Sequence, residues 1–227
     1  MTATVPAPVA TLDRDVERLG AYLDGSEPAE QLVAPQLGGD IRALLALTNP
    51  VERHRSGDKV IVPPEDDYVG DHKEYVLGPF ARPSESRFSD GSFGVLYAGI
   101  TYETARAEAA YWTDKFFIDT TLPPGSVART QWLSFRATSP NMADVRAKSG
   151  GIASIYDPKD YVVSRRWGAA LYSAKHDGVY YDSVRDKGGE CVGAFVPRIV
   201  SNVRLKQVVE FVWDGARVSQ VRLVDRI

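Results

Sequence analysis

The sequence predicts an α+β fold, in which helices and antiparallel strand pairs occur in mixed order. Two hairpin signals lie toward the C-terminal end: the apolar runs GVYYDSV and CVGAFV flank the turn RDKGGE, and a second pair of runs flanks Asp214-Gly215. This order favours α+β over a doubly wound parallel sheet. The sequence contains neither GxGxxG after a strand nor GxxxxGKS/T, so it offers no Rossmann fingerprint and no P-loop.

Two helices are expected in the N-terminal region. From Leu12 to Leu23, apolar residues recur at helical spacing, and Gly25 would end that helix. A second helix is expected over residues 40–47, between the N-cap sequence GGD and Asn49-Pro50.

A loop-rich connector follows these helices. Residues 51–86 are rich in charged residues, proline and glycine, and KVIV at residues 59–62 is the one short strand candidate. We therefore expect a helical N-terminal extension and connector over residues 1–75, and a main domain over residues 76–227.

The main domain begins with a strand and a helix that follow each other closely. The elements expected, in chain order, are a strand over residues 95–100, a helix over 102–112, a strand over 130–137, a helix from about 161 to 175, and the two hairpins. On the last helix, the apolar side is formed by Trp167, Ala170 and Leu171.

Composition and charge limit the classes of function. The chain has 227 residues, a net charge of −3 and a pI near 5.7, which argues against nucleic acid as its main partner. Cys191 is the only cysteine, so an internal disulfide is impossible. A reducing cytoplasm is the natural compartment, although a secreted protein can also lack disulfides. The N-terminal sequence lacks the pattern of a secretory signal, and no stretch approaches the roughly 18 apolar residues of a membrane span.

The helix over residues 102–112 places an acid on its apolar face. Thr101 can act as the N-cap, and Glu103 then lies in the first turn, where the helix dipole favours an acid. The apolar face follows at i, i+3, i+4 and i+7 and consists of Ala105, Glu108, Ala109 and Trp112. Because a buried carboxylate must be paired, hydrogen-bonded or protonated, Glu108 requires an explanation.

Two further polar residues precede this helix. Tyr97 lies in the expected strand and offers a ring and a hydroxyl, and Arg87 stands just before the turn at residues 89–92. An arginine fork suits a phosphate or a carboxylate. Either Arg87 and Glu108 form a structural ion pair with Tyr97 in the core, or the three residues form a site for an anionic ligand with a flat ring. The residue pattern alone leaves both interpretations open.

Two motifs resemble a known family. The stretch RFSDGSFGVLYAGITYETARAE, followed much later by DGVYYDSVRDKGGECVGAF, resembles the RES domain of bacterial toxin–antitoxin modules. That family is named for an arginine, a glutamate and a serine, which match Arg87, Glu108 and Ser183 here. Tyr97 matches the family's active-site tyrosine. The resemblance covers residues 80–200, and its central part is matched only loosely.

The resemblance implies a fold related to the NAD-dependent ADP-ribosyltransferases of the diphtheria-toxin type. It also implies a toxin that consumes NAD and passes ADP-ribose to water, to phosphate or to a protein, with phosphoribosyl pyrophosphate synthetase as a known target in the family. The implied partner is an antitoxin with a Xre-like DNA-binding domain. The N-terminal extension could dock a protein substrate, which favours a protein acceptor, although it could equally bind the antitoxin or be structural.

The chemistry of NAD cleavage suits the matched residues. Breaking the ribose–nicotinamide bond develops an oxocarbenium-like cation, and Glu108 is expected to stabilise that charge. Tyr97 is expected to stack on the nicotinamide or its ribose, and Arg87 to grip the pyrophosphate or orient that ribose. Ser183 is expected to hydrogen-bond the ligand. Arg185 shares the strand face of Ser183, where it contacts phosphate or caps the hairpin.

The remaining candidates have simpler interpretations. Trp112 and Trp167 are expected in the core, and Cys191 is expected to be a small core residue rather than a nucleophile. His54 and His72 lie near several acids, but their spacing matches no zinc pattern, so we expect no metal site.

Two other classes of function compete with an NAD-consuming toxin. A catalytically silent RES fold that serves only as a binding partner is the non-enzymatic alternative. A generic α+β hydrolase is less favoured, because the sequence lacks a GxSxG elbow and a convincing nucleophile–histidine pair.

Overall fold

The computed structural model describes residues 7–21, 60–150 and 153–224. Helices and strands alternate irregularly along the chain, so the predicted α+β class is confirmed. The strands are β1 (Val9–Ala21), β2 (Leu96–Gly99), β3 (Val127–Asp144), β4 (Gly178–Asp182), β5 (Glu190–Ala194), β6 (Val200–Trp213) and β7 (Val218–Val224). The α-helices are α4 (Lys73–Ala81), α5 (Tyr102–Thr120) and α6 (Val162–Ser173), and the short 3-10 helices are η2 (Pro64–Asp66), η3 (Ala147–Ser149), η4 (Ala153–Tyr156) and η5 (Pro197–Ile199).

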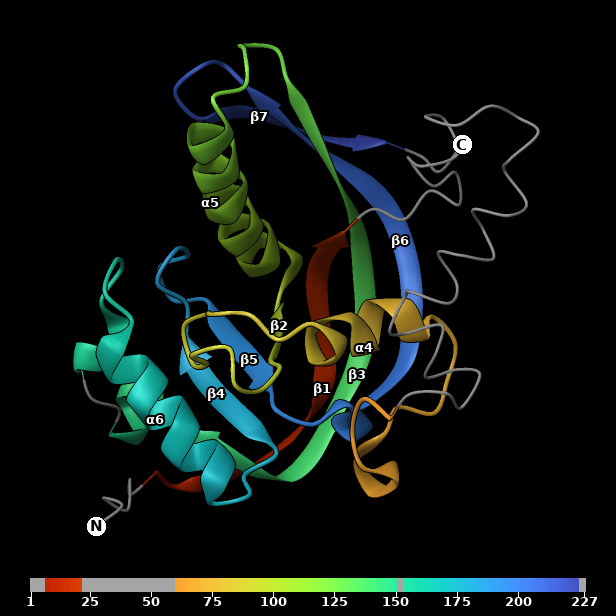
Figure 1. Ribbon diagram of the computed structural model, residues 1–227, viewed down its shortest axis with the longest axis vertical. Helices are drawn as coiled ribbons and strands as arrows, with labels where there is room; N and C mark the ends of the chain where they lie inside the picture. Colours follow the sequence, from red (N-terminus) through yellow and green to blue (C-terminus); the bar gives the residue numbers. More distant parts are fainter. Residues whose placement is uncertain (1–6, 22–59, 151–152, 225–227) are drawn as a thin grey trace.

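Within the part of the chain that the structure describes, five strands close into a ring. β1 pairs antiparallel with β3 from Val9↔Ala143 to Ala21↔Thr130, and it meets β2 at Glu17↔Gly99. β2 pairs with β5 and β5 with β4, and β4 runs parallel to the end of β3. β6 and β7 extend the sheet from β3. Figure 1 shows β3 and β6 as long curved strands, with α5 near β7 at one end and α6 beside β4 at the other.

Most elements expected in the main domain are confirmed. β2, α5, β3 and α6 occur where strand and helix patterns predicted them, although α5 runs to Thr120 and β3 runs to Asp144. Thr101 caps α5, since its side chain accepts a hydrogen bond from the Thr104 amide at 3.2 Å. Both C-terminal hairpins are present as β4–β5 and β6–β7. Gly215 adopts φ +104° in the second turn, a conformation that glycine tolerates best.

The helix predicted from Leu12 to Leu23 is wrong over its described part, because residues Val9–Ala21 form β1. Leu12 and Val16 are buried in the core, and their spacing of four fits a strand face as well as a helix face. Long-range pairing decides between the two. Arg136 of β3 forms an ion pair with Asp13 of β1 at 2.8 Å, an interaction that no local pattern reveals.

Other N-terminal expectations meet the limits of the described residues. The helix predicted over residues 40–47 lies outside them, as does Lys59 of the KVIV candidate, and Val60–Val62 form no strand. The boundary expected at residue 75 stays a prediction. β1, which lies before that boundary, is a member of the same sheet as the strands after it.

The central strands carry a core on each face. One core contains Leu96, Tyr180 and Val192 of the sheet with Leu77 and Phe80 of α4. The other contains Val95, Val179, Tyr181 and Cys191 of the sheet with Leu171 of α6. This confirms the predicted alternation along β2 and the interpretation of Cys191 as a core residue. None of the described helices is long and apolar enough to cross a membrane.

Candidate active site

A cavity of about 640 Å³ lies between α5, β1, β2 and the segment at residues 84–87. Its polar and ionisable lining includes Arg18, Arg87, Tyr97, Glu108, Tyr161 and Tyr181. This volume is in the range of small-molecule sites. The sequence predicted that Arg87, Tyr97 and Glu108 form one site, and all three border this cavity.

Glu108 is held by Ser183. The Ser183 hydroxyl donates to Glu108 Oε1 at 2.6 Å and accepts hydrogen bonds from the amides of Arg185 and Asp186 at 3.1 and 3.0 Å. Glu108 lines the cavity, whereas Ser183 does not. Ser183 therefore fixes one carboxylate oxygen of Glu108, and the expected direct contact of Ser183 with a ligand is not evident in this arrangement.

Tyr97 joins β2 to the loop before it. Its hydroxyl accepts from the Phe88 amide at 3.0 Å and shares a hydrogen bond with Ser86 Oγ at 2.9 Å. Burial raises the pKa of Tyr97 to about 12, so the phenol stays neutral at physiological pH. Because the hydroxyl is occupied by the loop, the ring is the part of Tyr97 that remains for a ligand.

Arg87 fixes a second segment next to the cavity. Its Nη1 donates to the carbonyls of Ile155 and Asp157 at 3.0 and 3.1 Å, and its guanidinium lies 4.5 Å from the ring centroid of Tyr161. Arg87 is 8% exposed. No ion pair joins Arg87 to Glu108, so the interpretation of these two residues as a structural ion pair is wrong.

The loop that carries Arg87 rests on α6. Arg165 of α6 donates to the Ser86 carbonyl at 3.0 Å and pairs with Glu85 at 3.0 Å. A Cβ on Gly168 would lie 1.8 Å from the Phe88 carbonyl oxygen, so only glycine permits this approach of helix and loop. The cavity wall at Arg87 thus depends on the close packing of α6.

Arg18 of β1 contributes a cation that the sequence interpretation missed. Its Nη1 donates to the Tyr97 carbonyl at 2.6 Å, and its Nε is buried with no hydrogen-bond partner among the described residues. Burial lowers the pKa of Arg18 to about 10, which still leaves it positively charged at neutral pH. Within the described parts of the chain, no carboxylate forms an ion pair with either Arg18 or Arg87. Glu17, Glu85 and Glu108 also line the cavity, so positive charge is offered to an anion locally, at Arg18 and Arg87.

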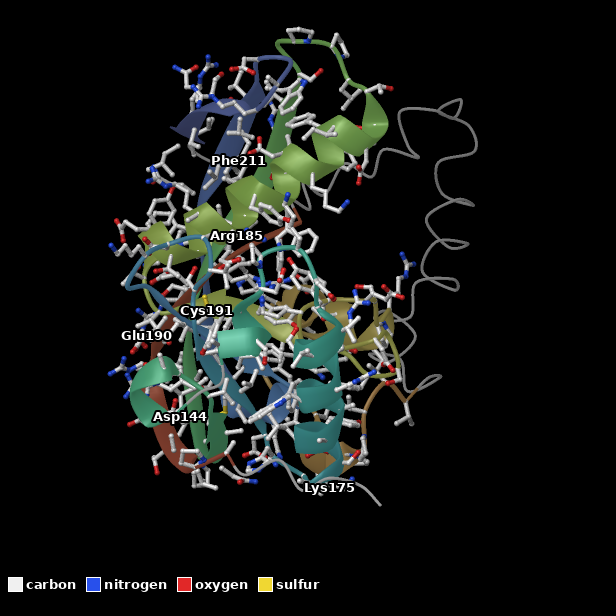
Figure 2. All side chains as sticks on the ribbon, turned by 90° about the vertical axis from the view of Figure 1, so that its left-hand side faces the viewer. Asp144, Lys175, Arg185, Glu190, Cys191 and Phe211 are labelled. Atoms are coloured by element: carbon white, nitrogen blue, oxygen red, sulfur yellow. The ribbon has the colours of Figure 1, made fainter. Side chains whose placement is uncertain are left out.

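Arg185 does not line the cavity. Its guanidinium lies 3.4 Å from the ring centroid of Tyr111 and donates to the Pro158 carbonyl at 2.6 Å. Arg185 thereby connects α5 with the segment before α6, and Figure 2 labels it beside α5. In this structure the residue closes the side of the site rather than facing into it.

Most residues around this cavity belong to a stretch of sequence that matches a known protein family. A protein-family model described as the RES domain matches residues 64–214, a range that contains Arg87, Tyr97, Glu108 and Ser183. The chain belongs to the RES domain family. The resemblance drawn from the two sequence motifs is confirmed.

One solved structure is also similar to this chain. A chain in the crystal structure of the M. tuberculosis MbcT–MbcA toxin–antitoxin complex is similar to this RES protein, with 15% sequence identity and a TM-score of 0.44. The similarity covers 64% of this chain and 82% of that chain. No curated protein matches the sequence.

The RES site has two features that the sequence did not indicate. Arg18 lies before the matched range and was assigned to a helix, so its contact with β2 could not be anticipated. Trp112, expected in the core, is 45% exposed and lines the cavity. Among the described residues, no group of three or more His, Cys, Asp or Glu side chains is arranged to hold a metal ion.

Proposed function

We propose that this RES protein cleaves the nicotinamide–ribose bond of NAD and transfers ADP-ribose to an acceptor. The observation that carries the proposal is the placement of Glu108. Its carboxylate is fixed by Ser183 at the wall of a cavity that also presents Tyr97 and the cations Arg18 and Arg87. A dinucleotide combines the flat ring, the ribose hydroxyls and the pyrophosphate that such a lining suits.

Each residue has a role in the proposed reaction. As the bond to nicotinamide lengthens, positive charge develops on the ribose, and the fixed Glu108 carboxylate stabilises it. Tyr97 offers its ring to the nicotinamide ribonucleoside, while Arg87 and Arg18 face the pyrophosphate. Nicotinamide leaves as a neutral molecule with the bonding electrons, and the acceptor supplies the nucleophile that bonds to the anomeric carbon.

The acceptor and the partner belong to the same proposal. We favour a protein acceptor, such as a phosphoribosyl pyrophosphate synthetase, over water or phosphate. We also propose that the protein is a toxin that acts in the cytoplasm and is restrained by a Xre-like antitoxin.

The test compares wild-type protein with Glu108→Gln and with Glu103→Gln, a control at an exposed position of the same helix. Nicotinamide release from NAD is measured together with NAD binding. We expect Glu108→Gln to lower kcat about a hundredfold or more while binding changes little, because the positive charge exists only in the transition state. Equal loss of kcat and binding, or no release of nicotinamide by the wild type, would contradict the proposal.

Labelled NAD then separates the acceptors. Label on a protein band supports transfer to protein, whereas free ADP-ribose or its phosphate supports NAD degradation. Unchanged growth and unchanged NAD levels in expressing cells would favour a silent binding partner.

A further inference from the structure

The wall that α5 contributes to the cavity extends well beyond Glu108. One face of this helix lines the cavity over about two turns after Glu108, and the large side chains on it are Trp112 and Phe116. At about 1.5 Å per residue, Trp112 lies roughly 6 Å and Phe116 roughly 12 Å along the helix from Glu108. The cavity therefore continues from the proposed reacting end toward an aromatic end.

The two rings are exposed although they border a cavity. Trp112 is 45% exposed and Phe116 is 53% exposed. Large apolar side chains that line a concave surface without being covered mark binding sites more often than scattered surface residues do.

Both rings contact neighbouring aromatic residues. Trp112 packs edge-on against Tyr111, with ring centroids 5.4 Å apart, and lies 6.4 Å from Tyr161. Phe116 lies 5.8 Å from Phe117, which itself stacks on Trp213 in the core at 5.2 Å. Each ring therefore lies against an aromatic neighbour, while part of its surface remains exposed.

We infer that Trp112 and Phe116 form a nucleobase subsite that stacks on the adenine half of the dinucleotide. The inference rests on the proposed function and extends it, since it assigns the second half of the substrate. A base bound there is joined through a pyrophosphate to the ribose at Glu108, and the cations Arg18 and Arg87 line the same cavity. Aromatic stacking accepts any base face, so the subsite recognises a nucleotide mainly by its ring and its charged linker.

The kinetic test compares NAD with nicotinamide mononucleotide, which has the same scissile bond but no adenylate. We expect Trp112→Ala and Phe116→Ala each to raise KM for NAD about tenfold, as loss of a stacking partner commonly does, with kcat nearly kept. KM for nicotinamide mononucleotide should not change. Ile118→Ala is the matched control, because Ile118 is 58% exposed on the same helix and does not line the cavity. Equal effects on both substrates, or no effect on either, would overturn the inference.

A binding measurement keeps the inference testable if the protein does not turn over NAD. Calorimetric titration of the intact protein with ADP-ribose should give an affinity about tenfold lower for Trp112→Ala than for wild type or Ile118→Ala. Failure of the wild type to bind ADP-ribose, or equal affinities for wild type and Trp112→Ala, would reject the subsite. Nicotinamide release without this loss of affinity would leave the proposed function standing and the subsite disproved.

Discussion

Ser183 touches the proposed catalytic carboxylate without lining the cavity. Its hydroxyl donates a hydrogen bond to one carboxylate oxygen of Glu108. The same hydroxyl accepts hydrogen bonds from the amides of Arg185 and Asp186, which fix its position. At the scale of single residues, Ser183 is therefore a positioning residue. Its loss should affect the transition state, which Glu108 is proposed to stabilise, more than the binding of NAD.

Ser183→Ala is expected to lower kcat for nicotinamide release about tenfold to a hundredfold, the usual consequence of losing a hydrogen bond to a charged group. KM should change little. Steady-state kinetics measure the separation of the two parameters, and Ser183→Thr, which keeps the hydroxyl, should recover much of kcat. Ser92→Ala serves as a control at an exposed turn. A rise in KM with unchanged kcat would instead assign Ser183 to ligand binding.

Single residues also show how far sequence reasoning reaches. Helix periodicity separated Glu108 from Glu103, because an acid among alanines on an apolar face is conspicuous. The same reasoning placed Trp112 in the core, since periodicity cannot distinguish a face that packs from a face that borders a cavity. Arg18 gave no signal at all, because its contact with Tyr97 spans 79 positions of the chain.

At the scale of elements, α6 and the loop of Arg87 pack closely because a glycine of α6 has no side chain at their contact. Gly168 lies in the middle of α6, where glycine normally costs stability, and it faces the backbone of Phe88. The glycine lowers the intrinsic stability of the helix, but it allows the loop to pack in a fixed position beside the cavity.

Gly168→Ala is expected to destabilise the protein by about 3 kcal/mol, because the added methyl group meets backbone rather than a flexible side chain. Urea unfolding measures the change, and nicotinamide release should fall as the loop is displaced. The control is Gly78→Ala in α4, where a Cβ meets nothing within 4 Å. That variant should be neutral or more stable by about 0.5–1 kcal/mol. Equal stability of the two variants would contradict this account of the packing.

The wrong prediction of a helix in place of β1 is also explained by how elements pair. The hairpins and the β2–α5 unit were predictable because their partners follow within a few residues, so turn residues and periodicity carry the information. β1 pairs with β3, more than a hundred positions later, as in Glu17↔Ser134. The spacing of its apolar residues matches a helix pattern locally, and only the distant partners select the strand.

At the scale of the whole molecule, buried tyrosines make stability depend on alkaline pH. Burial raises the pKa of Tyr97, Tyr156 and Tyr180 to about 12, whereas a tyrosine in an unfolded chain ionises near pH 10. The unfolded chain therefore releases these protons first as the pH rises. The stability that the tyrosines contribute is complete below about pH 10 and is lost as the pH approaches about 12.

The urea midpoint is accordingly expected to be nearly constant from about pH 8 to about pH 9.5 and to fall steeply above about pH 10. Tyr97→Phe should show a shallower fall, because one group with a raised pKa is removed. Tyr172→Phe, at a position 39% exposed, should follow the wild type. Identical pH profiles for wild type and Tyr97→Phe would show that Tyr97 does not carry this dependence.

The ring of strands extends beyond the residues that the family model matches. The family match spans residues 64–214, yet β1, which closes the ring between β2 and β3, lies wholly before it. A fragment cut to the matched range would expose the edges of β2 and β3 to pairing with other chains, a common route to aggregation. It would also lose Arg18, which with Arg87 supplies the cations that line the cavity among the described residues. We therefore expect solubility and ligand affinity in this protein to depend on the same short segment.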